Sequence, residues 1–267
     1  MKVKRSGNPL LLTAACVVAT AALATAQQYS GGDFKWRGAV ASGATLEIKG
    51  VNGDVTAEPA TSGEAEVIAV MRGRRSDPRQ VRVEVVQHPG VVTFCALYPS
   101  RNPDKPNECA AGEGGRMNVQ DNDVQVTFTV KVPPGVAYVA RTVNGDVTAQ
   151  SLNGPAHLRT VNGSATLSTS AHGDAATVNG SVHASLGAAD WNGELEFKTV
   201  NGSLTLDLPA DVNAEVRAAT VNGDISTDFP LTVSGRFSPR RLQGTIGAGG
   251  RTLALETVNG NIKLRRR

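Results

Sequence analysis

The stretch Thr142-Val143-Asn144-Gly145 decides the fold, because Thr-Val-Asn-Gly returns five more times along the chain. The further copies span residues 160–163, 177–180, 199–202, 220–223 and 257–260. An earlier Val-Asn-Gly, residues 51–53, follows Gly50 where the other copies have threonine. Seven copies in one chain make an internal repeat, which predicts a fold built from copies of one small unit.

Each Asn-Gly pair predicts a sharp turn. Asparagine and glycine both tolerate positive φ, which a type I′ turn requires at its two central positions. The residue after each glycine is Asp, Ser or Asn, whose short side chain can bond nearby backbone. The predicted turn residues are Asn52, Gly53, Asn144, Gly145, Asn162, Gly163, Asn179, Gly180, Asn201, Gly202, Asn222, Gly223, Asn259 and Gly260.

Apolar and polar residues alternate on both sides of these turns. In residues 204–208 leucine takes every second position, and upstream Leu195 and Phe197 alternate with charged residues. A period of two is that of a β-strand with one buried face. No long segment shows the 3.6-residue period of a helix, so the predicted class is all-β.

The spacing of the repeats favours a β-solenoid. From Asn144 onward the motif asparagines are 18, 17, 22, 21 and 37 residues apart, and the last interval is close to two periods. Weaker turn signals lie near the half period, at residues 152–154, 172–174 and 191–193. Coils of about 20 residues with short strands and sharp turns suit a solenoid. Stacked coils would align the Thr, Val and Asn of successive repeats as ladders.

An antiparallel hairpin β-sandwich is the alternative fold. Folding back at Asn201 would pair Phe197 with Leu206, which is a sensible cross-strand pair. The near-constant repeat length and the return of the whole four-residue motif favour the solenoid.

Residues 1–26 have the features of a secretory signal peptide. An apolar run over residues 10–23 ends in a small-residue cleavage site before Gln27, and its length is below the ~20 residues that a spanning helix needs. The basic residues ahead of the run are Lys2, Lys4 and Arg5. Lipidation at Cys16 is an alternative. We therefore expect an exported protein in the periplasm, at the outer membrane or outside the cell, with no transmembrane segment in its mature chain.

Removing the signal changes the charge argument. The whole sequence carries a net charge of +3, and the signal holds three basic residues and no acidic residue. The mature chain then has 24 basic and 24 acidic residues, so it lacks the positive field typical of nucleic-acid binding. No nucleic-acid partner is predicted.

The mature chain is predicted to be a single β-solenoid domain, residues 27–267, which is long enough for one sizeable core. Residues 133–267 carry the regular repeats, whereas residues 65–132 interrupt them with longer strands. The opening segment before them contains Phe34 and Trp36, which we expect to cover the end of the core, because solenoids need an atypical terminal coil.

Cys95 and Cys109 bracket a polar loop, and they are the only cysteines outside the signal. An even pair in an exported chain is predicted to form a disulfide. Closing a loop of this size stabilises the fold by ~3 kcal/mol in the chain-entropy model. The alternative, a two-thiolate metal site, lacks a second pair of ligands.

The sequence contains none of the common catalytic or nucleotide-binding motifs, so it predicts no catalytic residue, no cofactor and no metal site. Three of the four histidines lie in the repeats, where we expect exposed strand and turn positions. They are His157, His172 and His183.

Acidic residues give no clear site either. Four aspartates follow the glycine of a predicted turn: Asp54, Asp146, Asp174 and Asp224. Serine or asparagine takes this place in other repeats, which argues against a calcium-binding array. The strand acids Glu194, Glu196 and Asp207 are expected on a solvated face, although a catalytic β-helix would pair such carboxylates across coils.

These motifs resemble a bacterial "putative adhesin" family, a domain of unknown function made of β-strand repeats. The similarity lies in the Thr-Val-Asn-Gly-Asp/Ser turns, in Val-Pro-Pro-Gly-Val at residues 132–136 and in the closing segment 253–264, and it covers about residues 40–265. The resemblance implies a β-solenoid-like fold and a role at the cell envelope, and it carries over no catalytic residue. The loop between Cys95 and Cys109 looks like an addition to the pattern, and it is one place where a separate specificity would lie.

The sequence thus favours an exported, non-enzymatic β-repeat scaffold, an adhesin or envelope interaction protein. Its expected partner is an envelope or surface component, a glycan or a protein, bound through side chains that repeat with the coils. One alternative is a periplasmic structural or envelope-stress component that binds proteins. A polysaccharide-acting β-helix enzyme is the other, and three or more acids or bases converging in one groove would favour it.

Overall fold

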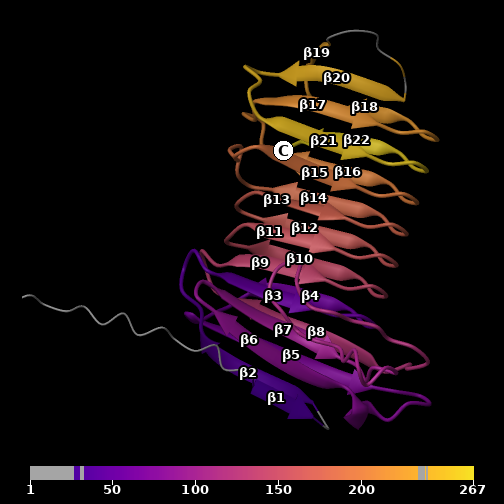
Figure 1. Ribbon diagram of the computed structural model, residues 1–267. Coiled ribbons are helices and arrows are strands. Elements are labelled where there is room, and N and C mark those ends of the chain that lie inside the picture. The colour runs from indigo at the N-terminus through magenta and orange to yellow at the C-terminus, as the bar shows by residue number, and fades with distance from the viewer. Residues whose placement is uncertain (1–26, 31–32, 234–237, 239) are drawn as a thin grey trace, which may run out of the picture.

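The computed structural model describes residues 27–30, 33–233, 238 and 240–267. The predicted signal peptide and Cys16 lie outside these residues. The described chain forms a stack of coils, in which each coil contributes one strand to each of two sheets (Figure 1). The only helix in this part is the short 3-10 helix η1 (Pro78–Gln80). Over the same residues, no helix has the length and hydropathy to span a membrane.

The two sheets, A and B, hold all the strands of the described residues. In spatial order, sheet A contains β1 (Gln27–Ser30), β6 (Arg82–His88), β7 (Val91–Leu97), β3 (Thr45–Lys49), β9 (Ala137–Arg141), β11 (Ala156–Arg159), β13 (Gly173–Ala176), β15 (Glu194–Lys198), β21 (Thr252–Glu256), β17 (Ala214–Ala219), β20 (Arg241–Ile246) and β19 (Thr232–Val233). Sheet B contains β18 (Ile225–Thr227), β22 (Ile262–Arg266), β16 (Leu204–Leu208), β14 (Val182–Leu186), β12 (Ala165–Thr169), β10 (Val147–Leu152), β4 (Val55–Pro59), β8 (Gln125–Val132), β5 (Glu64–Arg72) and β2 (Phe34–Ala39).

The repeats form parallel coils, as the solenoid prediction requires. Each coil runs along a strand of sheet A, turns at Asn-Gly and continues along a strand of sheet B. Phe197 pairs with Ala175 and Leu255 on parallel neighbours, so its predicted pairing with Leu206 in a hairpin sandwich is wrong. The weaker half-period signals mark the return turns from sheet B to sheet A.

The Asn-Gly turn is a corner between the two sheets, and the predicted type I′ geometry is wrong. None of the seven motif asparagines has positive φ, whereas Gly163 has a φ of 153°. Each asparagine instead forms a parallel bridge with the asparagine of the adjacent coil. Pairing between coils therefore continues through the corner, and the chain does not fold back on itself.

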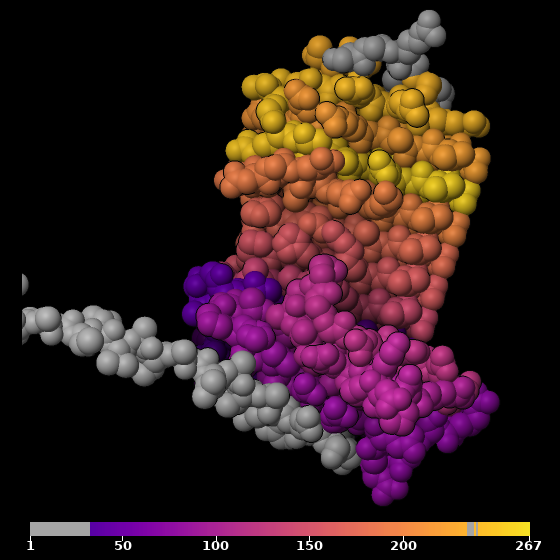
Figure 2. All heavy atoms as spheres, in the orientation of Figure 1, coloured from indigo at the N-terminus to yellow at the C-terminus, as the bar shows by residue number. Residues whose placement is uncertain are grey.

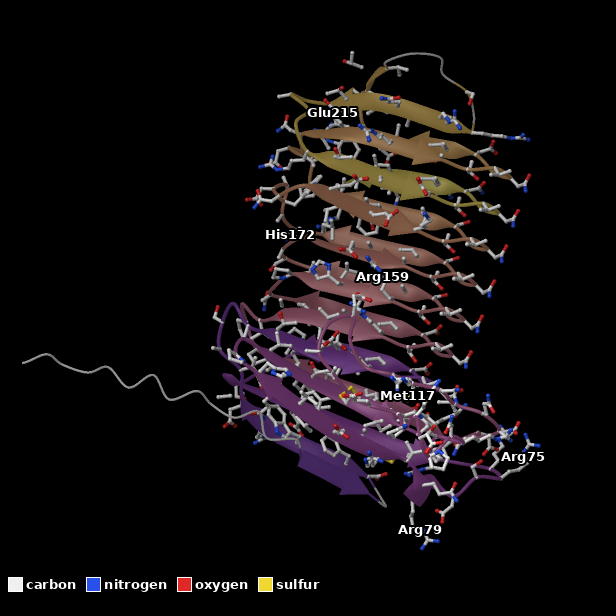
Figure 3. All side chains as sticks on the ribbon, viewed as in Figure 1. Arg75, Arg79, Met117, Arg159, His172 and Glu215 are labelled. Carbon is white, nitrogen blue, oxygen red and sulfur yellow. A yellow bond between two sulfur atoms is a disulfide. The ribbon has the colours of Figure 1, made fainter. Side chains whose placement is uncertain are left out.

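The corner asparagines form the predicted ladder. Six of the seven side-chain amide nitrogens donate to the amide oxygen of the asparagine in an adjacent coil at 2.7–2.8 Å, and these bonds join all seven side chains. The seventh, of Asn52, donates to the carbonyl oxygen of Asn122. Figure 3 shows such polar side chains recurring from coil to coil along the turn edge. The bonded residues, in spatial order, are Asn52, Asn144, Asn162, Asn179, Asn201, Asn259 and Asn222.

Two further ladders flank the asparagines. Each motif threonine is buried, and its hydroxyl donates at 2.7–3.1 Å to the carbonyl oxygen of the glycine in the adjacent coil. In all coils but that of Asp224, the side chain of the residue after the glycine accepts a bond from the backbone N–H of the equivalent residue one coil away, at 2.7–3.4 Å. The side chain at this position needs an oxygen atom to accept that bond, which explains why only Asp, Ser and Asn occur there. The motif valine, by contrast, points outward, and five of these valines are 38–56% exposed.

The order of the last two coils differs from their order in the sequence. The final coil, β21–β22, lies between β15–β16 and β17–β18, and Figure 1 shows it in yellow between orange coils. The 37-residue interval, although close to two periods in length, therefore does not correspond to two coils stacked in chain order. The chain leaves the stack after β18, pairs β20 antiparallel to β17, and returns to fill the slot beside β15.

The opening of the chain extends both sheets beyond the first repeat. β7 pairs parallel to β3 and β8 parallel to β4, while β6, β5, β1 and β2 add antiparallel strands outside them. Strands β5 to β8 have seven to nine residues, against three to six in the repeat coils. Phe34 and Trp36 pack edge-on against Phe94, with ring centroids 6.2 and 5.0 Å apart.

Replacing a corner glycine by alanine should destabilise the stack. A Cβ at Gly163 would lie 2.1 Å from the carbonyl oxygen of Gly145 in the adjacent coil, and φ there is disfavoured for alanine. We expect Gly163→Ala to lower the free energy of unfolding by about 2 kcal/mol or more, measured by denaturant unfolding. The control is Gly63→Ala, because its Cβ would meet nothing within 4 Å. Equal stability of the two variants would contradict the close-approach argument.

The asparagine ladder needs an amide at every interior step, because each side chain between its two ends both donates and accepts. Asn179→Asp removes the donor to Asn162 and sets a carboxylate against its amide oxygen. We expect a loss of about 1 kcal/mol at pH 7, seen as a lower unfolding midpoint. Asn192→Asp, in an exposed return turn, should leave the midpoint unchanged, and a matching loss there would show a charge effect unrelated to the ladder.

Candidate binding groove

A loop replaces the Asn-Gly corner between β7 and β8. We call residues 98–124 the disulfide loop, and Figure 2 shows this magenta segment standing out over the face of the lower coils. The backbone N–H of Val126 donates to the carbonyl oxygen of Asn52 at 2.7 Å, so β8 still joins the stack where the first corner begins. The hydroxyl of Tyr98 donates to the carbonyl oxygen of Val124 at 2.8 Å and ties together the two ends of the loop.

The disulfide loop is fastened to the outer face of sheet A. The structure contains the Cys95–Cys109 disulfide, and Leu97 and these cysteines form a small apolar cluster beneath the loop. Buried Glu47 accepts bonds from the hydroxyl of Thr93 at 3.0 Å and from the backbone N–H of Gly112 at 2.9 Å.

Lys49 adds a second attachment. Its ammonium donates at 2.5–3.0 Å to the carbonyl oxygens of Ala110, Gly112 and Gly114. Burial lowers the pKa of Lys49, partly opposed by the charge of Glu47. The loop is thus held by a covalent bond and by two charged side chains of β3.

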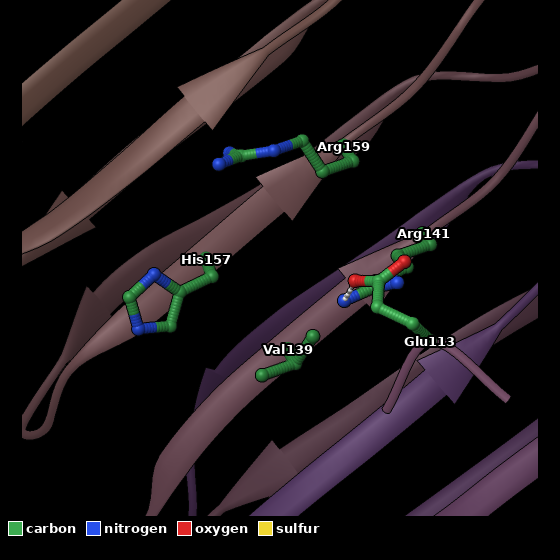
Figure 4. A pocket seen from close by; sticks show the side chains of 5 residues that line it. All are labelled: Glu113, Val139, Arg141, His157 and Arg159. Carbon is green, nitrogen blue, oxygen red and sulfur yellow. Dashed lines mark ion pairs between the residues drawn. The ribbon is translucent and has the colours of Figure 1, made fainter. Parts of the chain in front are cut away.

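A hollow of about 460 Å³, which we call the groove, lies beside the loop on sheet A (Figure 4). Glu113 comes from the loop, and the other lining residues come from β9 and β11. The lining consists of Glu113, Val139, Arg141, His157 and Arg159. Glu113 is 88% exposed and lies 2.6 Å from Nη2 of Arg141, whose charge lowers the pKa of this carboxyl through a hydrogen bond.

Two of the lining residues, His157 and Arg159 on β11, share the carboxylate of Asp174 as a partner. Nδ1 of His157 lies 2.5 Å from Oδ2 of Asp174, its register neighbour on β13, and Arg159 pairs with the same carboxylate. Burial raises the pKa of Asp174, but the hydrogen bond from His157 and the charge of Arg159 outweigh it, and the net pKa is below its usual value.

A second hollow, of about 530 Å³, lies on the other side of the loop, against the start of the asparagine ladder. It combines amide groups of the ladder with apolar side chains of the loop. Its lining is Gly50, Val51, Asn52, Met117, Asn118, Val119, Asp121, Asn122, Val143 and Asn144. The loop therefore borders both the charged face and the corner edge of the first coils.

The other candidate residues from the sequence are dispersed. His183 lies on sheet B, 3.6 Å from Asp207, and so does not meet His157 on sheet A. Glu194 and Glu196 lie on sheet A, whereas Asp207 is on sheet B, where it is bound by Arg265. The aspartates after the corner glycines are used by the backbone ladder. Within the described residues, no group of three or more His, Cys, Asp or Glu side chains is placed to hold a metal ion.

Sequence reasoning missed the basic side chains of the groove. Lys49, Arg141, Arg159 and Lys198 each stand three residues before a motif asparagine. Because the corners stack in register, residues at a fixed distance from the asparagine lie side by side on sheet A. This offset was the signal that would have found them.

A two-sheet parallel stack with repeated polar corners defines the chain as a β-repeat protein. Residues 140–265 match the family model described as Toastrack DUF4097, a domain of unknown function. This region runs from the end of β9 to β22 and holds the six Thr-Val-Asn-Gly copies. The predicted resemblance to a β-strand-repeat family of unknown function is confirmed there.

Some solved structures also resemble this chain, at low sequence identity. One is a "putative cell adhesion protein" from Clostridium sporogenes, at 8% identity over 92% of this chain and 100% of that chain, with a TM-score of 0.47. Another is a "putative adhesin" from Bacteroides fragilis, at 11% identity over 89% of this chain and 98% of that chain, with a TM-score of 0.37. These TM-scores are too low to bear on function. No curated protein matches the chain.

The depressed pKa of Asp174 predicts a pH-dependent contribution to stability. The charged carboxylate is favoured in the folded state, so its contribution is present above the unfolded pKa of about 3.9 and is lost as pH falls through the lower folded value. We expect Asp174→Asn to lose about 1 kcal/mol at pH 7 and to approach the parent protein near pH 3 in thermal unfolding. Asp190→Asn, at an exposed turn, is the control. A pH-independent difference would contradict the assignment to ion pairing.

Proposed function

We propose that the protein is an exported, non-enzymatic β-repeat scaffold that binds a component of the cell envelope at the groove beside the disulfide loop. The observation that carries this proposal is the open, charged hollow between Glu113, Arg141 and Arg159, bordered by a loop that is fastened to the sheet. Fixed polar groups around a preformed hollow favour recognition, because little ordering is needed on binding.

The groove suits binding better than catalysis. Its lining offers two acid or base side chains, of which Glu113 pairs with Arg141 and His157 is hydrogen-bonded to Asp174. General acid–base hydrolysis needs both partners poised at the reacting bond. The repeats meanwhile commit their threonines and asparagines to the ladders, which supports a rigid scaffold as their role.

A periplasmic component that binds a protein partner is the second candidate. Its support is the row of exposed valines along the corner edge, next to Met117 and Val119 in the second hollow. Such a partner would contact the corner edge and leave the charged groove free.

The test is capture of envelope components on the purified protein. We expect saturable binding of an envelope fraction from its own cells, and of a member of a glycan panel, with Arg141→Gln weakening both by at least tenfold. The matched control is Arg241→Gln, on β20 at the other end of sheet A, which should bind as the parent does.

Different results support the two candidates. Binding that is lost in Arg141→Gln and kept in Arg241→Gln supports the groove. Capture of one envelope protein, with no glycan and no effect of Arg141→Gln, supports the second candidate. No binding of any envelope component contradicts the proposed function, and chemical turnover of a bound glycan contradicts its non-enzymatic part.

A further inference from the structure

The basic side chains of sheet A form a row along the axis of the stack. Lys49, Arg141, Arg159, Ala176 and Lys198 are register partners on β3, β9, β11, β13 and β15. Four of these five positions are basic, and the row ends at Glu256 on β21. Adjacent strands are ~4.8 Å apart, so Arg159 and Lys198 are separated by roughly 10 Å across Ala176.

Not every cation in the row is available. Lys49 is occupied by the loop carbonyl oxygens. The Arg159 and Lys198 side chains are 40% and 48% exposed, and Lys198 pairs with Glu256 at 2.9 Å on the solvent-facing surface. Exposed pairs of this kind contribute little and exchange readily. Arg141, Arg159 and Lys198 each pair with a carboxylate, of Glu113, Asp174 and Glu256 in turn, so a ligand at the row must compete with these pairs.

The carboxylate of Glu113 binds the guanidinium of Arg141 as a ligand carboxylate would. It reaches the guanidinium from an exposed loop and contacts Nη2. Nε of Arg141 is buried and has no hydrogen-bond partner among the described residues. Because Nε is buried, a ligand carboxylate would meet the exposed side of the guanidinium at Nη2, where Glu113 now lies. It would therefore have to displace Glu113, which is exposed and is held to Arg141 through Nη2.

The surroundings of the row favour a sugar polymer over a nucleic acid. Neither the groove lining nor the register positions of the row include a Phe, Tyr or Trp side chain on which a base could stack, and the ring of His157 is hydrogen-bonded to Asp174. The lining carries several hydrogen-bonding side chains, Glu113, Arg141, His157 and Arg159, which suit the hydroxyl groups of a sugar. A linear polymer with a carboxylate at regular intervals can meet cations that recur with the strands.

From this geometry we propose that the groove takes a linear polysaccharide bearing carboxylates, which lies along the stack axis across β9, β11, β13 and β15. One carboxylate displaces Glu113 from Arg141, and later ones meet Arg159 and Lys198. This inference rests on the proposed function and names the ligand class of that same groove. Glu113 then acts as an internal competitor that weakens binding.

The test measures binding of polygalacturonate to the full protein by titration calorimetry at low salt. The ligand controls are its fully methyl-esterified form, which keeps the backbone and removes the charge, the galacturonate monomer, and single-stranded DNA. We expect polygalacturonate to bind, the ester not to bind, and affinity to fall as salt is raised.

Three variants test the roles of single side chains. Glu113→Gln should bind polygalacturonate up to about fivefold more tightly, because the competing carboxylate is gone. Arg141→Gln should bind at least tenfold more weakly. Lys198→Gln should weaken polymer binding about threefold and leave monomer binding unchanged, because only a chain reaches β15. Glu113 and Lys198 are exposed, so these two variants stay informative if Arg141→Gln does not fold.

Other outcomes overturn the inference. It is contradicted if the methyl ester binds as tightly as polygalacturonate. It is also contradicted if single-stranded DNA binds as tightly and responds to the variants in the same way, or if Glu113→Gln leaves polygalacturonate binding unchanged or weakens it. Envelope capture that depends on Arg141 without polygalacturonate binding would leave the proposed function intact and reject the ligand class. Polygalacturonate binding without any envelope capture would support the ligand class and contradict the proposed function.

Discussion

The whole stack depends on the close approach of glycine backbones at its corners. A side-chain carbon at Gly163 would lie 2.1 Å from the carbonyl oxygen of Gly145, and the other corner glycines meet the same constraint. This approach lets the threonine of one coil reach the glycine carbonyl of its neighbour. It also brings the asparagine amides within hydrogen-bond distance. One missing Cβ atom thus permits both ladders, and each ladder in turn fixes the register of the coils.

Fixed register converts a position in the repeat into a position in space. Residues three places before the asparagine all point outward on sheet A and lie side by side, so basic residues at that position form a row. Residues five places before the asparagine also lie side by side on sheet A, which is why His157 on β11 lies next to Asp174 on β13. The disulfide loop uses this arrangement as well, because Lys49 of the same row holds its carbonyl oxygens. A charged site on such a stack therefore follows from the choice of a single repeat position.

The sequence predicted the parts of this structure that local pattern determines. Alternation with a period of two gave the strands, and the spacing of Asn-Gly gave the coils. The turn type was wrong because a hairpin turn and a corner use the same residues. They differ in where the next strand finds its partner, which is not a local property. The groove was missed for a related reason: Lys49 and its loop partners are 61–65 residues apart, and the loop has no periodicity.

The inserted final coil shows the limit of reading a repeat as a linear array. A solenoid whose coils stack in chain order gains stability one interface at a time. Here β17–β18 has β21–β22 as its neighbour on the repeat side, so that interface forms only when the end of the chain is in place. The inserted coil also brings Glu256 beside Lys198, and this acidic residue ends the basic row. The same insertion therefore completes both sheets and sets the length of the charged surface.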